Sequence, residues 1–138
     1  MALHQVLFAI YAIGCCAYAL LRGGSVERIG AITNMAASVL SILAVEMDGW
    51  GPLNLNLVII DIAVCVVFFI LTSSNRFWPI WAFGFSLASV AANMAQLLPH
   101  QEQFIDHYAR SEAIWGWPAL AVLVIGTWRY RHPGINDT

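Results

Sequence analysis

The sequence alternates long apolar runs with short polar breaks. The apolar runs cover about 3–21, 26–45, 54–72, 77–98 and 111–130. Each run is close to the roughly 20 residues that an α-helix needs to cross the hydrocarbon core of a bilayer. The breaks are rich in glycine, proline and capping side chains, which end helices. The pattern predicts an all-α membrane protein with one domain, residues 1–138, in which five transmembrane helices joined by short loops form a compact bundle.

The fourth run carries a line of polar side chains. These residues recur at spacings of three and four, so they share one face of a helix while apolar residues cover the rest: Ser86, Ser89, Asn93, Gln96 and His100. Hydrocarbon offers no hydrogen bonds, so a polar face must meet other helices or a water-filled cavity. An interhelical seam and a hydrophilic lining predict the same spacing.

Asp61 is the only carboxylate placed well inside an apolar run. A lone acid near the centre of a membrane helix costs roughly 2.5–3.5 kcal/mol, so we expect partners that compensate it. With alternating helix directions, a rise of about 1.5 Å per residue brings several polar side chains close to its level. We therefore expect a polar cluster, or a pocket that opens outward, made from Asp61, Asn93, Ser89, Ser38, Tyr11 and Gln96.

Two interpretations of Asp61 stay open. It is either a protonatable or cation-binding group at the base of the pocket, or a neutral acid whose hydrogen bonds hold helices together. Three further expectations are local. Glu27, in the first turn of the second run, suits the positive end of a helix dipole. The aromatic cluster that begins the fourth run, with Phe77, Trp78 and Trp81 around Pro79, suits an interfacial belt. Pro118 should kink or divide the fifth run.

Composition supports a membrane location and argues against several other classes. Hydrophobic residues make up 60 % of the chain and charged residues 10 %, whereas a soluble domain carries about 25 % charged residues. The net charge of −2 and the lack of a basic patch argue against nucleic-acid binding. The cysteines lie inside apolar runs, where they act as small hydrophobic residues rather than as disulfide or zinc ligands: Cys15, Cys16 and Cys65.

The arginines predict the orientation. They flank the break after the first run (Arg22, Arg28), the break after the third run (Arg76) and the end of the fifth run (Arg129, Arg131). These three places share one side of a membrane only if the chain crosses it five times. Because positive residues favour the cytoplasmic side, the amino terminus is expected outside and the carboxyl terminus inside.

Two strings, Arg-Phe-Trp-Pro at 76–79 and Ile-Gly-Thr-Trp-Arg at 125–129, resemble segments of small multi-spanning proteins of alphaproteobacterial inner membranes. The resemblance implies a bacterial inner (cytoplasmic) membrane. It implies no activity, cofactor or site residue.

The chain contains no nucleophile motif, P-loop, dinucleotide fingerprint, HExxH or CxxC sequence. We therefore expect no catalytic activity, no cofactor and no metal site. His4 and His100 could meet near the outer surface as haem ligands on facing helices, or could both be solvated interfacial residues.

Small residues recur along the second and fourth runs, as they do where membrane helices approach closely. The preferred function is an accessory or assembly subunit of a larger membrane complex, or a homo-oligomer, with the bilayer and other membrane subunits or itself as partners. The first alternative is a small transporter, channel or ligand-binding membrane protein that uses the pocket around Asp61. The second alternative is a haem-binding helical bundle.

Overall fold

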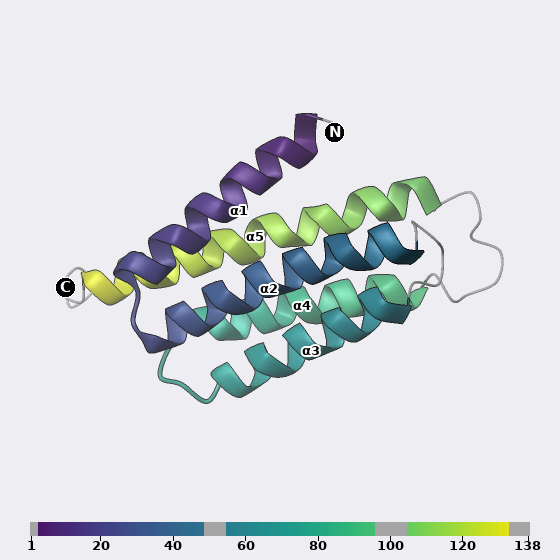
Figure 1. Cartoon of the computed structure of the whole chain (residues 1–138). Helices are drawn as coiled ribbons and strands as arrows, with labels where there is room; N and C mark the ends of the chain where they lie inside the picture. Colours follow the sequence, from purple (N-terminus) through teal and green to yellow (C-terminus); the bar gives the residue numbers. More distant parts are fainter. Residues whose placement is uncertain (1–2, 49–54, 96–104, 133–138) are drawn as a thin grey trace.

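A computed structural model describes residues 3–48, 55–95 and 105–132, which form five α-helices and no strand. The helices are α1 (Leu3–Arg22), α2 (Ser25–Asp48), α3 (Leu55–Leu71), α4 (Trp78–Ala95) and α5 (Ile105–Arg131). They run alternately in opposite directions, and each packs beside the next in the chain (Figure 1). Because α5 also packs against α1, the five helices form a closed ring. The all-helical, five-helix part of the prediction is confirmed.

The largest difference from the predicted bounds is at α5. This helix begins at Ile105 instead of near residue 111 and continues through Pro118 to Arg131. Proline removes one backbone hydrogen bond from a helix and crowds the preceding turn. Here α5 packs against α1, α2 and α4, and these contacts outweigh one missing bond. The part of the fourth run after Ala95 lies outside the described residues.

Three chain segments meet at one end of the bundle, which is the left end in Figure 1: the α1–α2 turn, the α3–α4 turn and the carboxyl end of α5. The α3–α4 turn is held by its own hydroxyl groups. Thr72, Ser73 and Ser74 each donate to a carbonyl oxygen of the last turn of α3, at 2.6–2.7 Å. The same three carbonyls also accept the backbone N–H groups of Thr72, Ser73 and Ser74, at 3.0–3.2 Å. Carbonyls at a helix end lack partners within the helix, so hydroxyl and N–H groups of the turn together satisfy them.

The outer surface of the bundle is apolar. Large apolar side chains are exposed on all five helices, including Ile10, Ile32, Ile59, Trp81 and Ile125. Where burial is described, the buried polar and charged residues are instead Glu27, Asn93 and Thr127. By length and hydropathy, one described segment is suited to crossing a membrane, Ser25–Met47 with a mean hydropathy of 1.6. Only 17 % of the residues in its apolar window are buried, so the rest of the protein does not cover this helix.

Candidate functional site

The first polar cluster joins α3 to α4 through Asp61. Ser89 Oγ donates a hydrogen bond to Asp61 Oδ2 at 3.1 Å, and Asn93 Nδ2 donates to the same oxygen. Ser89 and Asn93 stand one turn apart on α4, so both side chains reach a single position on the neighbouring helix. Asn93 is buried and Asp61 is half-buried. The structure therefore brings together three of the residues that the sequence placed in one cluster.

The other residues expected near Asp61 lie elsewhere or outside the described part of the chain. Ser38 is exposed on α2 and donates to the carbonyl oxygen of Asn34 in its own helix, at 2.9 Å. Tyr11 stacks on Trp117 of α5, with ring centroids 4.7 Å apart, and its hydroxyl donates to the Trp117 carbonyl oxygen at 3.4 Å. An estimate of depth along a helix axis does not decide which face of the helix a side chain occupies, so Ser38 and Tyr11 have other partners than Asp61.

Gln96 and His100 fall outside the described residues, as does the side chain of His4, which lies in α1. The suggestion that His4 and His100 form a haem pair therefore rests on the sequence alone. Among the residues that the structure describes, no group of three His, Cys, Asp or Glu side chains could hold a metal ion.

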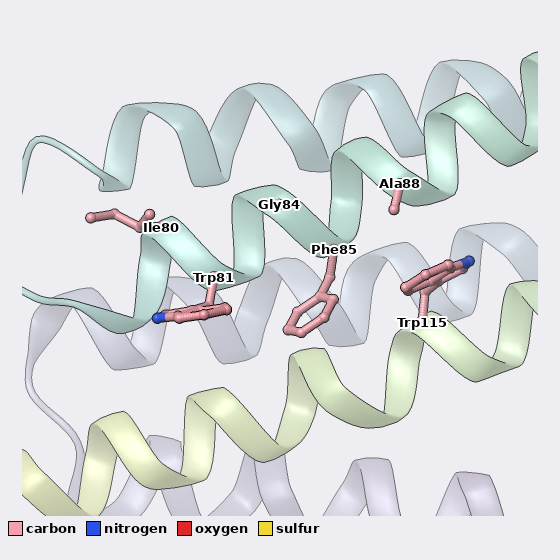
Figure 2. A pocket seen from close by; sticks show the side chains of 6 residues that line it. All are labelled: Ile80, Trp81, Gly84, Phe85, Ala88 and Trp115. Carbon is pink, nitrogen blue, oxygen red and sulfur yellow. The ribbon is translucent and has the colours of Figure 1, made fainter.

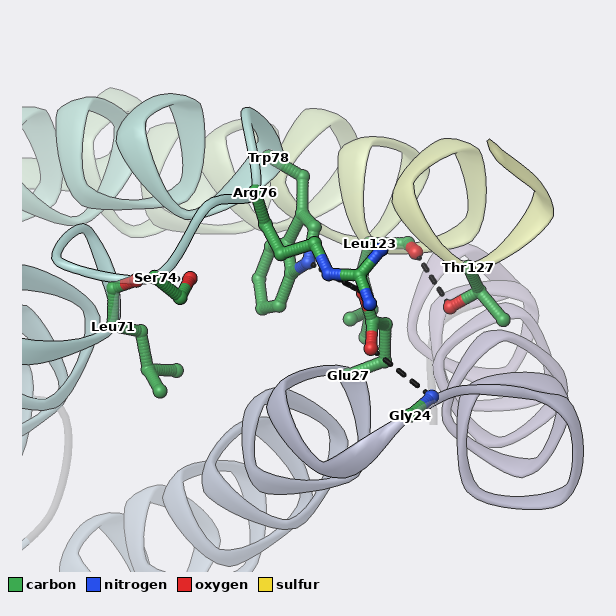
Figure 3. A network of polar contacts seen from close by, with 8 residues as sticks. All are labelled: Gly24, Glu27, Leu71, Ser74, Arg76, Trp78, Leu123 and Thr127. Atoms are coloured by element: carbon green, nitrogen blue, oxygen red, sulfur yellow. Dashed lines mark hydrogen bonds and ion pairs between the residues drawn. The ribbon is translucent and has the colours of Figure 1, made fainter. Parts of the chain in front are cut away.

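The second polar cluster surrounds Glu27, whose side chain is completely buried (0 % exposed). Its Oε2 accepts a hydrogen bond from the Gly24 N–H at 3.0 Å, and its Oε1 accepts one from Trp78 Nε1 at 3.3 Å. Arg76 Nε lies 3.7 Å from the same Oε1 and supplies a positive charge (Figure 3). A buried carboxylate is tolerated when it has both a charged partner and hydrogen bonds. Glu27 has both: one hydrogen bond comes from the α1–α2 turn, and the other hydrogen bond and the charge come from the α3–α4 turn and the start of α4.

Trp78 closes this cluster from the inside of the bundle. It is 1 % exposed, and its ring lies edge-on to Phe68, with centroids 6.0 Å apart. Gly30 of α2 and Gly126 of α5 both face the indole, and a Cβ atom at either glycine would overlap it. Small residues let helix backbones approach closely, and here two glycines make room for one large ring. Trp78 is thus a core residue, and its expected place in an interfacial belt is wrong.

Two arginine–aromatic contacts fasten the α3–α4 turn to the end of α5. The Arg76 guanidinium lies 4.2 Å from the centre of the Tyr130 ring, and the Arg129 guanidinium lies 4.7 Å from the centre of the Phe77 ring. Each segment contributes one cation and one ring. At exposed sites such contacts are worth about 0.5–1 kcal/mol each.

Sequence reasoning missed the Glu27 cluster because the helix dipole already explained an acid in the first turn of α2. A signal was nevertheless present. The arginine pattern put three segments at one end of the bundle, and Glu27 is the single acid in the described part of those segments. An acid among five arginines is a strong candidate for an ion pair.

A groove of about 370 Å³ lies on the outer surface between α4 and α5. Its lining is almost entirely apolar: Ile80, Trp81, Gly84, Phe85, Ala88 and Trp115. Figure 2 shows the rings of Trp81, Phe85 and Trp115 in a row along the seam between the two helices. A Cβ atom at Gly84 would meet nothing within 4 Å, so this glycine faces open space.

Comparisons with protein-family models, with curated proteins and with solved structures found no match. The functional argument therefore rests on the geometry of this chain.

Proposed function

We propose that the chain is an integral protein of a bacterial inner membrane and that all five helices cross the bilayer. One observation carries this proposal: large apolar side chains are exposed around the whole bundle, while a glutamate, an asparagine and a threonine are buried. In water this distribution would leave far more contiguous apolar surface exposed than a soluble monomer tolerates. In a bilayer the same surface meets lipid, and the polar groups find partners inside.

The proposed orientation has the amino terminus outside and the carboxyl terminus inside. It is supported by the gathering of the α1–α2 turn, the α3–α4 turn and the end of α5 at one end of the bundle (Figure 1). These segments carry five of the six arginines of the chain: Arg22, Arg28, Arg76, Arg129 and Arg131. The positive-inside rule assigns that end to the cytoplasm.

We propose further that the protein has no catalytic activity and acts by association, either with other membrane subunits or with copies of itself. The open groove at Gly84 supports this proposal. A Cβ atom at Gly30, Gly116 or Gly126 would meet an aromatic ring of a neighbouring helix, whereas one at Gly84, as at Gly14, would meet nothing within 4 Å. Of the two open glycines, Gly84 lines the groove. In membranes, helices associate through small residues that admit a partner's side chains.

The test is purification in mild detergent, followed by measurement of the mass of the particle. We expect an assembly larger than one chain, and Gly84→Leu should shift it towards the monomer by filling the groove. Gly14→Leu is the matched control, because Gly14 also faces open space but lies on α1, away from the groove. A stable wild-type monomer with no other subunit bound would contradict the association proposal.

A second candidate function uses Asp61. Its support is the cluster in which Ser89 and Asn93 hold the carboxylate between α3 and α4, since ionisable groups inside membrane helices often lie on ion or proton pathways. Asp61→Asn in a proteoliposome flux or ligand-binding assay decides it, because unchanged behaviour removes Asp61 from any transport mechanism. The haem alternative has no support among the described residues, and a colourless purified protein excludes it.

A further inference from the structure

The ring of Tyr130 is the point where three segments of the chain meet, one of which carries the ring. The ring itself belongs to the last turn of α5. The Arg76 guanidinium of the α3–α4 turn lies over one face, 4.2 Å from the ring centre. Gly24 of the α1–α2 turn is also adjacent, since a Cβ atom built there would lie 3.2 Å from the ring carbon Cζ. Both turns therefore lie against the same ring at the end of α5.

Each of these segments carries arginines, and together they form what we call the arginine end: Arg22, Arg28, Arg76, Arg129 and Arg131. In the described part of these segments there is one carboxylate, Glu27, which is completely buried and already pairs with Arg76. Arg22, Arg28, Arg129 and Arg131 are all exposed. None of these four has a carboxylate partner among the described residues. Within the described ranges, the arginine end thus presents four exposed cations that are not paired with a carboxylate.

The surroundings of these cations are suited to a lipid more than to a free anion. Exposed aromatic rings of Phe77, Trp128 and Tyr130 lie among the arginines, as expected at the headgroup level of a bilayer. Ile80 and Ile125, about one turn further into α4 and α5, are exposed as well. A molecule with a phosphate at one end and an acyl chain at the other would meet cations and then apolar surface in the right order.

We propose that the arginine end binds the headgroups of anionic phospholipids in the leaflet that contains it. This proposal rests on the proposed membrane location. The attraction comes from the exposed guanidinium groups, which bind phosphate oxygens through charge-assisted hydrogen bonds. Juxtamembrane arginines each add to binding at an anionic surface, and the effect is screened by salt.

The experiment has two parts. The first is flotation of the purified protein with vesicles of pure phosphatidylcholine, which tests insertion alone. The second is titration of the detergent-solubilised protein with phosphatidylglycerol, with phosphatidylcholine and with glycerol phosphate, followed by native mass spectrometry of the bound species. We expect flotation with phosphatidylcholine, and at least about tenfold tighter binding of phosphatidylglycerol than of phosphatidylcholine.

The variant for the second part is Arg28→Gln with Arg131→Gln, because neither side chain has a recorded contact within the described residues and the fold should survive. Each substitution should weaken phosphatidylglycerol binding roughly fivefold. Arg110→Gln is the matched control, since it makes the same change in the opposite half of α5 and should leave binding unchanged.

Equal binding of the two lipids, or an equal loss in the Arg110→Gln control, would overturn the lipid proposal while leaving the membrane proposal intact. Glycerol phosphate that binds as tightly as phosphatidylglycerol would show a site for free phosphate esters and would also overturn it. A protein that does not float with vesicles would contradict the membrane location, and with it both proposals.

Discussion

The Glu27 and Asp61 clusters each hold one carboxylate between helices, but they are built differently. Glu27 is fully buried, and its two oxygens accept from Gly24 and Trp78 and face the Arg76 guanidinium. Asp61 is half-buried, and both of its recorded donors reach the same oxygen from a single helix. The first cluster therefore ties several segments together, whereas the second ties α3 to α4.

The comparison separates two uses of a buried acid. Glu27 requires two acceptor oxygens and a negative charge, because its partners are all donors and one is a cation. Asp61 needs only one acceptor oxygen for its recorded bonds. We therefore expect small chemical changes in the Glu27 cluster to lower the stability of the protein, and the Asp61 cluster to tolerate loss of its charge.

The largest expected effect concerns the ring that seals the Glu27 cluster. Trp78→Ala should lower the free energy of unfolding by about 3–5 kcal/mol, because it leaves a cavity between Gly30, Gly126 and Phe68 and removes one hydrogen bond to Glu27. The measurement is unfolding in mixed detergent micelles titrated with dodecyl sulfate. Trp81→Ala is the control, since Trp81 is 59 % exposed on the same helix and its removal should change little.

The two acids can be compared directly by their amides. Glu27→Gln should cost about 1–3 kcal/mol, because the new NH₂ group must face a donor and Arg76 loses its counter-charge. Asp61→Asn should cost clearly less, because one carbonyl oxygen can still accept from both Ser89 and Asn93. The same unfolding titration measures both. Equal losses in the two variants would refute the distinction between the clusters.

A smaller effect is expected from the outer face of the Glu27 cluster. Tyr130→Leu removes the ring beneath the Arg76 guanidinium and should lower stability by up to about 1 kcal/mol. Tyr130→Phe keeps the ring and should retain most of the wild-type stability. If the phenylalanine variant lost as much as the leucine variant, the contribution would come from the hydroxyl group and not from the ring.

The smallest expected effect is on the Asp61 side. Ser89→Ala removes one of two hydrogen bonds to a half-buried carboxylate, and interhelical hydrogen bonds in membrane proteins average about 0.6 kcal/mol. The unfolding midpoint in the same titration should therefore move only slightly. A loss as large as that in Glu27→Gln would mean that Asp61 supports more of the bundle than its recorded contacts indicate.

Sequence patterns predicted much of this fold for physical reasons that act locally. Hydrophobic run length and turn residues placed the helices, and the position of Asp61 in an apolar run indicated a need for partners such as Ser89 and Asn93. The same reasoning grouped Ser38 and Tyr11 with Asp61, because depth along a helix axis can be estimated without knowing how each helix is rotated. Rotation depends on packing, which a single sequence does not reveal.

Trp78 and Pro118 are two positions where the local sequence pattern favoured a different structure from the one found. An aromatic residue at the start of a membrane helix is common at the interface, and only the two glycines on α2 and α5 make the buried position of Trp78 possible. A proline in an isolated helix favours a break, but α5 packs against three other helices and stays continuous. In both cases contacts between distant segments overrode a local preference.

The most direct test of the membrane proposal is labelling of single cysteines with a membrane-impermeant maleimide in a variant that lacks the three native cysteines. Glu46→Cys and Ser73→Cys lie at exposed positions at opposite ends of the bundle. The account predicts that Glu46→Cys reacts in cells whose inner membrane is intact, and that Ser73→Cys reacts only after that membrane is disrupted. Equal labelling of both positions in intact cells, or recovery of the protein in the soluble fraction, would contradict it.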